Sequence, residues 1–149
     1  MYMYTGAHSI TFINPSGTER NTWTNWKLIP TQKPVVPMPE FDNNYVEIPG
    51  SNGSLDLSEY LTGGPVYRDR SGSFEFYLVD PNIDTAINTI AQFIHGKKLK
   101  FVLSDDPNFY YEGRMALSDK RSDAGYPRVT ISYRVGPYKI NRSSGTPQF

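Results

Sequence analysis

The sequence predicts an α+β fold that is mainly β: an antiparallel β-sandwich with one α-helix. Twelve glycines and twelve prolines divide the 149 residues into short segments. Many of these segments are rich in β-branched and aromatic residues, and several alternate polar with apolar positions, as half-buried strands do. A single segment, residues 83–94, instead has its apolar residues at helical spacing.

The first half of the chain contains the expected strands 8–13, 22–29, 45–48, 54–57 and 73–79. Pro49-Gly50 and Asn52-Gly53 are strong turn signals between the third and the fourth of these. Residues 30–39 contain four prolines, whose missing backbone donors exclude a central strand. We therefore expect an extended, polyproline-like connector there.

The expected helix has its apolar residues on one face from Ile83 to Ile94. Asp80 is expected to cap its N-terminus, with Pro81 at the first helical position, where a missing N–H costs nothing. Gly96 stands where a left-handed residue commonly ends a helix. We expect this helix to close one side of the sheet.

The β pattern resumes after the helix in the expected strands 98–103, 109–117 and 126–135. In the last one, Val129, Ile131, Tyr133 and Val135 share one face, which indicates an antiparallel meander with one face buried. Gly113 inside a strand indicates a bulge or a close approach by another backbone. We expect residues 1–140 to form one domain and the polar residues 141–149 to form a flexible tail.

Composition restricts the possible functions. Fifteen basic residues balance fifteen acidic ones, which disfavours tight DNA binding but leaves a locally basic surface possible. The chain has no cysteine, so disulfides, thiolate nucleophiles and zinc–thiolate sites are excluded. No secretory signal is visible, and no apolar run approaches the ~20 residues that a membrane span needs.

No set of residues predicts catalysis, a metal or a cofactor. His8 and His95 lie in unrelated segments, and His95 is explained by its place at the end of the helix. Asp105-Asp106 beside Pro107 is typical of a solvated turn. The glycine clusters at residues 50–53 and 63–65 lack the setting of a phosphate-binding loop, and no serine lies in a nucleophile elbow. We expect a protein that is not an enzyme.

Aromatic residues make up 14% of the chain, and tyrosine is enriched at contacts between proteins. Tyr110 and Tyr111 are neighbours in an expected strand, so they point to opposite faces and cannot share one core. One of them is expected to present aromatic surface to a partner or to solvent.

Several blocks of sequence, taken in their order and spacing, resemble the N-terminal domain of siphophage distal tail proteins and their prophage relatives. The first block, residues 21–30, contains Trp23, Trp26 and Pro30. A later block contains Ile48-Pro49-Gly50, and the last is Pro137-Tyr138-Lys139. Together they cover residues 21–30, 33–36, 45–50, 52–58, 66–70, 72–76, 94–100, 103–107, 110–114, 131–133 and 137–139.

This resemblance implies a virion structural protein with a β-sandwich related to the tail-tube fold. Six copies would form a ring between the tail tube and the hub at the tail tip, after assembly in the host cytoplasm. The implied partners are the chain itself, the tail tube protein and the tail-associated hub protein, with transient contact to DNA passing through the lumen and none to a membrane. Longer relatives add a galectin-like domain, so a sequence ending soon after Tyr138 is either a short member or part of a longer protein, and carbohydrate attachment through that domain is in doubt.

A ring of this kind needs segments that reach from one copy to the next. We expect the glycine-rich residues 52–70 to form such an arm, with residues 109–126 as the alternative. Arg70 is expected to pair with Asp56 or Glu75 within the chain. The predicted subunit-interface residues are Asn52, Leu55, Leu57, Tyr60, Tyr67, Arg68, Arg70, Tyr110 and Tyr111.

Three other functions compete with the distal ring. A tail tube or tube-terminator subunit would share the fold. A carbohydrate-binding module would use Trp23 or Trp26 as a stacking platform, although a strand tryptophan more often belongs to the core. A tail-associated hydrolase would need a catalytic set of residues that the sequence does not indicate.

Overall fold

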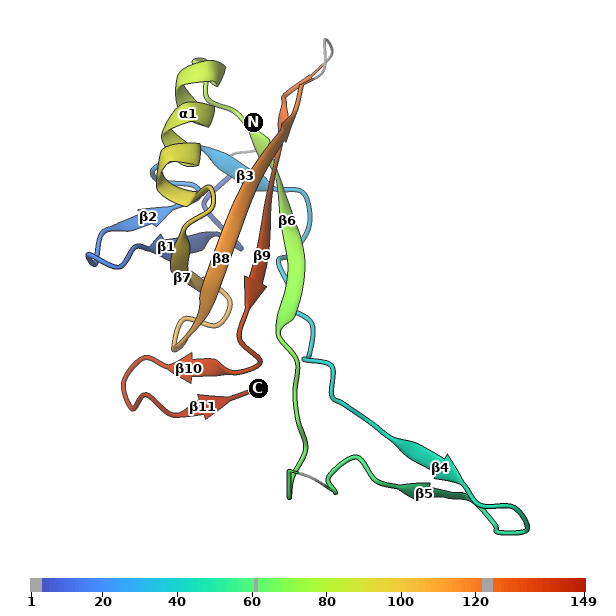
Figure 1. Cartoon of the computed structure of the whole chain (residues 1–149). Coiled ribbons are helices and arrows are strands. Elements are labelled where there is room, and N and C mark those ends of the chain that lie inside the picture. Colours follow the sequence, from blue (N-terminus) through green and yellow to red (C-terminus); the bar gives the residue numbers. More distant parts are fainter. Residues whose placement is uncertain (1–3, 61, 122–124) are drawn as a thin grey trace.

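The computed structural model describes residues 4–60, 62–121 and 125–149 (Figure 1). Its strands are β1 (Ile10–Ile13), β2 (Glu19–Asn21), β3 (Leu28–Pro30), β4 (Tyr45–Glu47), β5 (Ser54–Asp56), β6 (Arg70–Leu78), β7 (Lys98–Leu103), β8 (Phe109–Lys120), β9 (Arg128–Val135), β10 (Lys139–Asn141) and β11 (Pro147–Gln148). The helix α1 spans Ile83–Ile94. Among the described residues this is a mainly β fold with one helix, so the predicted fold class is confirmed.

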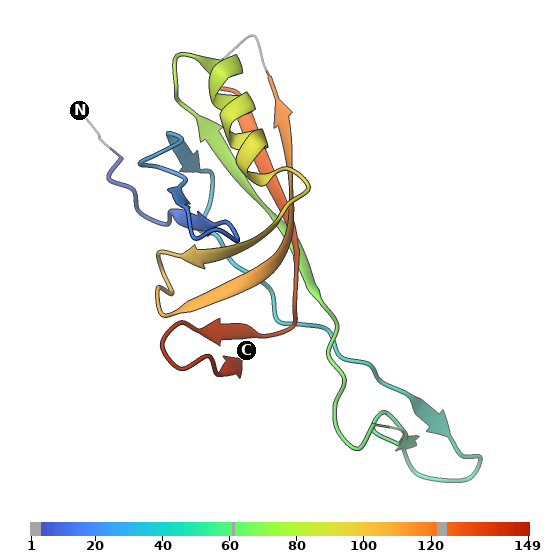
Figure 2. The same ribbon diagram turned by 60° about the vertical axis from the view of Figure 1, so that its left-hand side comes forward.

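The body is one continuous antiparallel sheet in the order β2-β1-β7-β8-β9-β6-β3. The sheet is strongly curved, so that β1 and β2 face the long strands β6 and β9 across the core (Figures 1 and 2). Its two ends approach each other through the loop between β2 and β3, where Thr22 N–H donates to Ile10 O and Leu28 N–H donates to Thr22 O. β10 adds to the start of β8 and pairs with β11, while β4 and β5 form a separate two-stranded unit.

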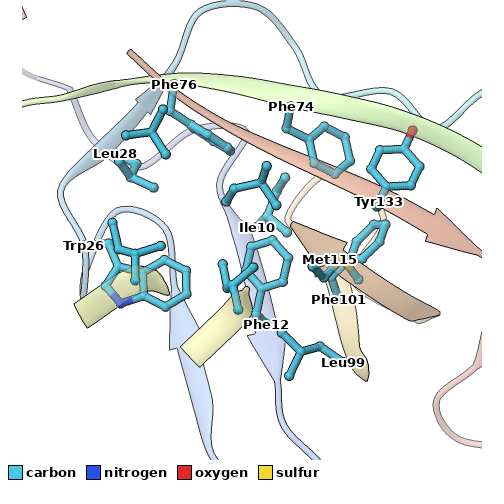
Figure 3. Close-up of a cluster of buried hydrophobic side chains, with 14 of the residues drawn as sticks. Ile10, Phe12, Trp26, Leu28, Phe74, Phe76, Leu99, Phe101, Met115 and Tyr133 are labelled. Carbon is cyan, nitrogen blue, oxygen red and sulfur yellow. The ribbon is translucent and has the colours of Figure 1, made fainter. Parts of the chain in front are cut away.

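The core lies inside this curved sheet and is rich in aromatic rings (Figure 3). Phe101 of β7 lies 6.0 Å from Phe12 of β1 and 5.6 Å from Phe74 of β6, measured between ring centroids. On β9, Val129, Ile131, Tyr133 and Val135 are all buried, which confirms the face predicted for this strand. Burial of such large apolar side chains is the main term that holds the sheet in its curved form.

Helix α1 covers one side of the core through Ile87, Ile90 and Ile94, as its periodicity predicts. Its first turn differs from the prediction, because Asn82 and not Asp80 is the N-cap residue. The Asp80 carboxylate accepts a hydrogen bond from Asn82 N–H at 2.8 Å, so it supports the turn that precedes the helix and leaves Pro81 outside it. Gly96 has φ 74°, the left-handed conformation expected after the C-terminus. No described helix has the length and apolar character that crossing a membrane requires.

The strand expected over residues 22–29 is wrong except at its end, where β3 begins at Leu28. Residues 22–27 form a turn in which Lys27 N–H donates to Trp23 O at 3.1 Å and Lys27 has φ 55°. The Asn21 side chain accepts hydrogen bonds from Trp23 N–H at 2.9 Å and Thr24 N–H at 3.2 Å. An asparagine that bonds to the backbone just ahead of it competes with strand formation in this way.

Two further predictions concern irregular segments. Residues 31–39 form an extended connector without a regular strand, and Pro34 and Val36 point into the body while Val35 and Met38 are exposed. The residues expected to form a flexible tail instead fold back as the β10–β11 hairpin, in which Ile140 pairs with Pro147.

Gly113 confirms the close approach predicted for it. A Cβ atom at this position would lie 2.0 Å from Arg134 O of β9.

Candidate assembly surface

A two-stranded arm, residues 41–67, projects away from the body (Figures 1 and 2). Its strands β4 and β5 are antiparallel, with Tyr45 opposite Asp56 and Glu47 opposite Ser54. Gly50 and Gly53 at its tip have φ 78° and φ 80°, which explains why glycine follows proline and asparagine in this turn. Every residue of β4 and β5 is exposed.

The arm has two chemically different faces. Val46 lies opposite Leu55, and Ile48 and Leu57, each one residue beyond the end of its strand, continue the alternation on the same side. The opposite face presents Tyr45, Glu47 and Asp56. Ile48 and Leu55 are each 47% exposed. Because a lone hairpin has no second layer to bury its apolar side, these side chains stay open to solvent in the isolated chain.

The base of the arm is closed by short backbone and side-chain contacts. Phe41 and Tyr67 form a β-bridge, and Arg68 N–H donates to Glu40 O at 2.7 Å. Arg68 Nε lies 2.6 Å from Asp42 Oδ1, and this hydrogen bond raises the pKa of the arginine. The arm therefore has a defined root at residues 40–42 and 66–68.

The predicted interface residues fall into two groups. Asn52, Leu55, Leu57 and Tyr60 lie on the arm, and Tyr67 and Arg68 lie at its base. The arm itself begins eleven residues earlier than the expected residue 52, at Phe41. The sequence predicts the strand at residues 45–48 but not its place in the arm, so Tyr45, Val46 and Ile48 are absent from the predicted interface. The two expected strands on either side of Pro49-Gly50 carried this signal, because they predict a hairpin.

The second group consists of Arg70, Tyr110 and Tyr111, and it is not on the arm. Arg70 and Tyr111 are buried within their own chain, with the guanidinium carbon 5.4 Å from the tyrosine ring centroid, so neither offers free surface to a partner. Burial raises the pKa of Tyr111, and the charge of Arg70 opposes this effect. Tyr110 lies on the opposite face, half-buried beneath Lys100 Nζ at 4.7 Å.

Arg70 does not pair with either acid proposed for it. Its Nε donates to Pro137 O at 3.0 Å, whereas Glu75 lies 3.7 Å from Arg128 and Asp56 accepts a hydrogen bond from Ser58 N–H. Arg70 is the first residue of β6 and points into the body, which takes it away from both carboxylates.

The alternative arm, residues 109–126, is not an arm over its described part. β8 spans Phe109–Lys120 and lies between β7 and β9 in the centre of the sheet. Residues 122–124 of this prediction lie outside the described residues.

The outer face of the central strands is strongly basic. Lys98, Arg114 and Arg134 lie directly opposite one another across β7, β8 and β9. The strand register places six cations on this face of β6–β9, namely Lys98, Lys100, Arg114, Lys120, Arg128 and Arg134, against two acids, Glu75 and Glu112. Like charges directly opposite each other destabilise a sheet. Three of these cations have an acidic partner, because Lys98 lies 3.8 Å from Glu112, Arg128 3.7 Å from Glu75 and Arg134 3.1 Å from Asp69.

The residues considered for chemistry have local partners. His8 Nδ1 lies 2.7 Å from Asp105 Oδ2, and Asp106 lies 2.7 Å from Lys139 Nζ at the turn predicted for these acids. His95 Nδ1 accepts a hydrogen bond from Leu117 N–H at 3.1 Å, next to the helix C-terminus. In the part of the chain that the structure describes, no three acidic or histidine side chains group as metal ligands would.

The two tryptophans differ in how far they are buried. Trp26 is 4% exposed and packs between Phe12, 5.9 Å away, and Phe93, 5.7 Å away. Trp23 is half-buried, with Tyr4 against it at 4.7 Å and Lys27 Nζ 5.1 Å from its ring centroid. The burial of Trp26 removes one of the two stacking platforms that the carbohydrate-binding hypothesis needs.

The sequence matches no protein-family model, and no curated protein matches it significantly. The structure, however, is similar to the crystal structure of SPP1 Dit (gp 19.1), described as a paradigm of the hub adsorption apparatus in phages that infect Gram-positive bacteria. The two superpose with a TM-score of 0.61 at 15% sequence identity over 89% of this chain. The chain spans 52% of the length of that protein, and the similarity shows a shared fold.

Proposed function

We propose that this protein is a structural component of a bacteriophage tail tip, in which copies of the chain form a ring between the tail tube and the hub. The shared fold with SPP1 Dit and the resemblance of residues 21–139 to distal tail proteins support this function. The ring has six subunits in this proposal. Its place is the virion, after assembly in the host cytoplasm.

The observation that carries the ring is the arm. The apolar face of the arm is exposed in the isolated chain. The arm projects away from the body, so the main sheet does not cover this face (Figure 2). From Phe41 to Ser51 it reaches roughly 30 Å at about 3.3 Å per residue. An arm that docks on a different surface of the next copy makes a heterologous contact, and such contacts close into a ring when the rotation permits.

The basic outer face of β6–β9 suits weak contact with a polyanion. In a ring that surrounds a channel, Arg114 and Arg134 on this face would meet the phosphates of passing DNA. Asp69 lies 3.1 Å from Arg134 and Glu112 lies 3.8 Å from Lys98, so part of this charge is already compensated. The contact is therefore transient and labile to salt.

The role is geometric and involves no chemistry. The chain supplies a rigid sheet and a projecting arm, and its partners are its own copies, the tail tube protein and the hub protein. A cell-wall zymogram of the purified protein tests the absence of hydrolase activity, and a clear lytic band would contradict it.

The ring is tested by mass measurement in solution over a range of concentrations, followed by electron microscopy of negatively stained particles. The expected result is a species of several subunits that appears with rising concentration and forms closed rings in one or two layers. Long cylinders would instead identify a tail tube subunit. A monomer at every concentration, together with no labelling of tail tips by specific antibodies, would contradict the proposed function.

A further inference from the structure

The base of the arm rests on the C-terminal hairpin, residues 139–149. The Tyr67 ring at the base packs edge-on against Phe149, with 4.7 Å between centroids and an interplanar angle of 71°. Tyr67 also meets Tyr138 at 6.0 Å, and Tyr138 stacks on Phe149 at 5.3 Å and 19°. Three rings therefore join the root of the arm to the end of the chain.

The hairpin is in turn fixed to the body. Ile140 of β10 pairs with Tyr110 of β8, which makes the hairpin part of the hydrogen-bonded sheet. Lys139 Nζ lies 2.7 Å from Asp106 Oδ2 and 4.4 Å from the Phe109 ring centroid. Arg142 Nη1 donates to Pro107 O at 3.1 Å. These contacts hold the hairpin against the turn between β7 and β8, so it is a firm support.

Arg70 connects the segments that lead into and out of the arm to the residue just before the C-terminal hairpin. It is the first residue of β6, three residues beyond the arm, and its Nη1 donates to Pro37 O at 3.4 Å, in the connector that leads into the arm. Its Nε donates to Pro137 O, immediately before Tyr138, at 3.0 Å. Arg70 is 3% exposed, so water does not compete for these bonds. The contacts of Arg70 hold these two segments and the start of the hairpin next to one another.

We propose that the C-terminal hairpin is a brace that sets the direction of the arm, with Phe149 and Tyr138 as positioning residues. Without the three-ring cluster, the contacts left at the root are the Phe41–Tyr67 bridge, the Arg68 N–H bond to Glu40 O and the Arg68–Asp42 ion pair, which join the two sides of the arm to each other and not to the body. That ion pair is exposed, and exposed pairs contribute little to stability. The arm would then pivot at residues 40–41 and 67–68 while the body stays folded. This inference does not depend on the ring.

The experiment measures the distance from the arm tip to the body. The chain has no cysteine, so Ser51→Cys at the tip and Ser118→Cys on β8 accept one spin label each without interference. Labelled protein diluted into unlabelled protein reports distances within one chain, whatever its assembly state. The otherwise unaltered protein is expected to give one narrow distance distribution, and Phe149→Ala is expected to give one at least twice as wide with an unchanged midpoint of thermal unfolding.

Two further variants separate positioning from folding. Phe149→Tyr keeps the ring and is expected to keep the narrow distribution, and Tyr126→Ala, which removes an exposed ring from the opposite end of the body, should do the same. A narrow distribution in Phe149→Ala would overturn the proposal. A broad distribution that appears together with a lower unfolding midpoint would also overturn it, because the hairpin would then act through stability of the body.

Discussion

At position 113 of the sheet, the neighbouring backbone leaves room for glycine and for no larger residue. It lies in the middle of β8, opposite Leu99 of β7 and Val135 of β9. A Cβ atom there would lie 2.0 Å from Arg134 O and 2.7 Å from Val135 Cα, and both contacts are with backbone that cannot rotate away. Gly113→Ala is therefore expected to lower the free energy of unfolding by about 1–3 kcal/mol, the usual cost of overpacking. Chemical denaturation of the two proteins measures the difference.

Gly136 provides the matched control for this substitution. It lies one residue beyond β9, its φ is not in the left-handed region, and nothing lies within 4 Å of a Cβ atom built on it. Gly136→Ala should therefore change stability by no more than about 0.5 kcal/mol. Equal destabilisation by the two substitutions would show that the close approach at Gly113 is not the cause.

Tyr133 makes the core sensitive to alkaline pH. Burial raises the pKa of Tyr133 to about 12, the nearby Tyr111 adds to this effect, and Arg70 opposes it. A tyrosine in the unfolded chain has a pKa of about 10, so the unfolded state loses its proton first. The contribution of Tyr133 is therefore fully present below pH ~10 and is lost as the pH rises towards 12.

The corresponding substitution is Tyr133→Phe, which keeps the ring stacked on Phe74 at 4.8 Å. Between pH ~9 and ~11.5, the loss of unfolding free energy should be smaller in this variant by on the order of 1–2 kcal/mol. It should not vanish, because burial also raises the pKa of Tyr111. The exposed substitution Tyr126→Phe is the control, and an effect of the same size there would contradict the role of burial.

Among the elements, the arm contributes none of its described residues to the hydrophobic core of the body. Its apolar face is open, so Val46→Ser combined with Leu55→Ser should change the unfolding free energy by no more than about 0.5 kcal/mol. The same change removes apolar area from the proposed contact between copies, and association is expected to weaken by at least tenfold. Sedimentation at matched concentrations measures this. The exposed Tyr126→Ser should leave association unchanged, and retained association in the arm variant would contradict the proposed docking face.

The elements also show what the sequence predicts and where it fails. The helix, the central strands and the hairpin turn at Pro49-Gly50 follow from periodicity and turn chemistry, which are local properties. The turn at residues 22–27 was missed because the Asn21 side chain, and not the β-rich composition around it, decides that backbone. The inward orientation of Arg70 could not be predicted, since it depends on carbonyl groups of Pro37 and Pro137, which are 33 and 67 residues away.

At the scale of the whole molecule, a net charge of zero hides a separation of charge. The arm carries four of the fifteen acidic residues, Asp42, Glu47, Asp56 and Glu59, and no basic one. The other residues therefore hold eleven acidic and all fifteen basic side chains. Hydrogen bonds from Ser58 hold the pKa of Asp56 below its ordinary value, so this charge persists under mildly acidic conditions. Opposite charges at two ends of a molecule favour head-to-tail contact and speed its formation.

Association of the copies should therefore weaken as salt is added. Exposed charges are screened beyond about 10 Å at 0.1 M ionic strength, so the effect should be clear between roughly 0.05 and 0.5 M. Glu47→Gln combined with Asp56→Asn is expected to weaken association several-fold at low salt and to flatten its salt dependence. Glu19→Gln combined with Glu112→Gln removes the same charge from the body, where the basic excess then grows, and should not weaken association. If both pairs of substitutions had the same effect in sedimentation experiments, net charge and not its placement on the arm would control assembly.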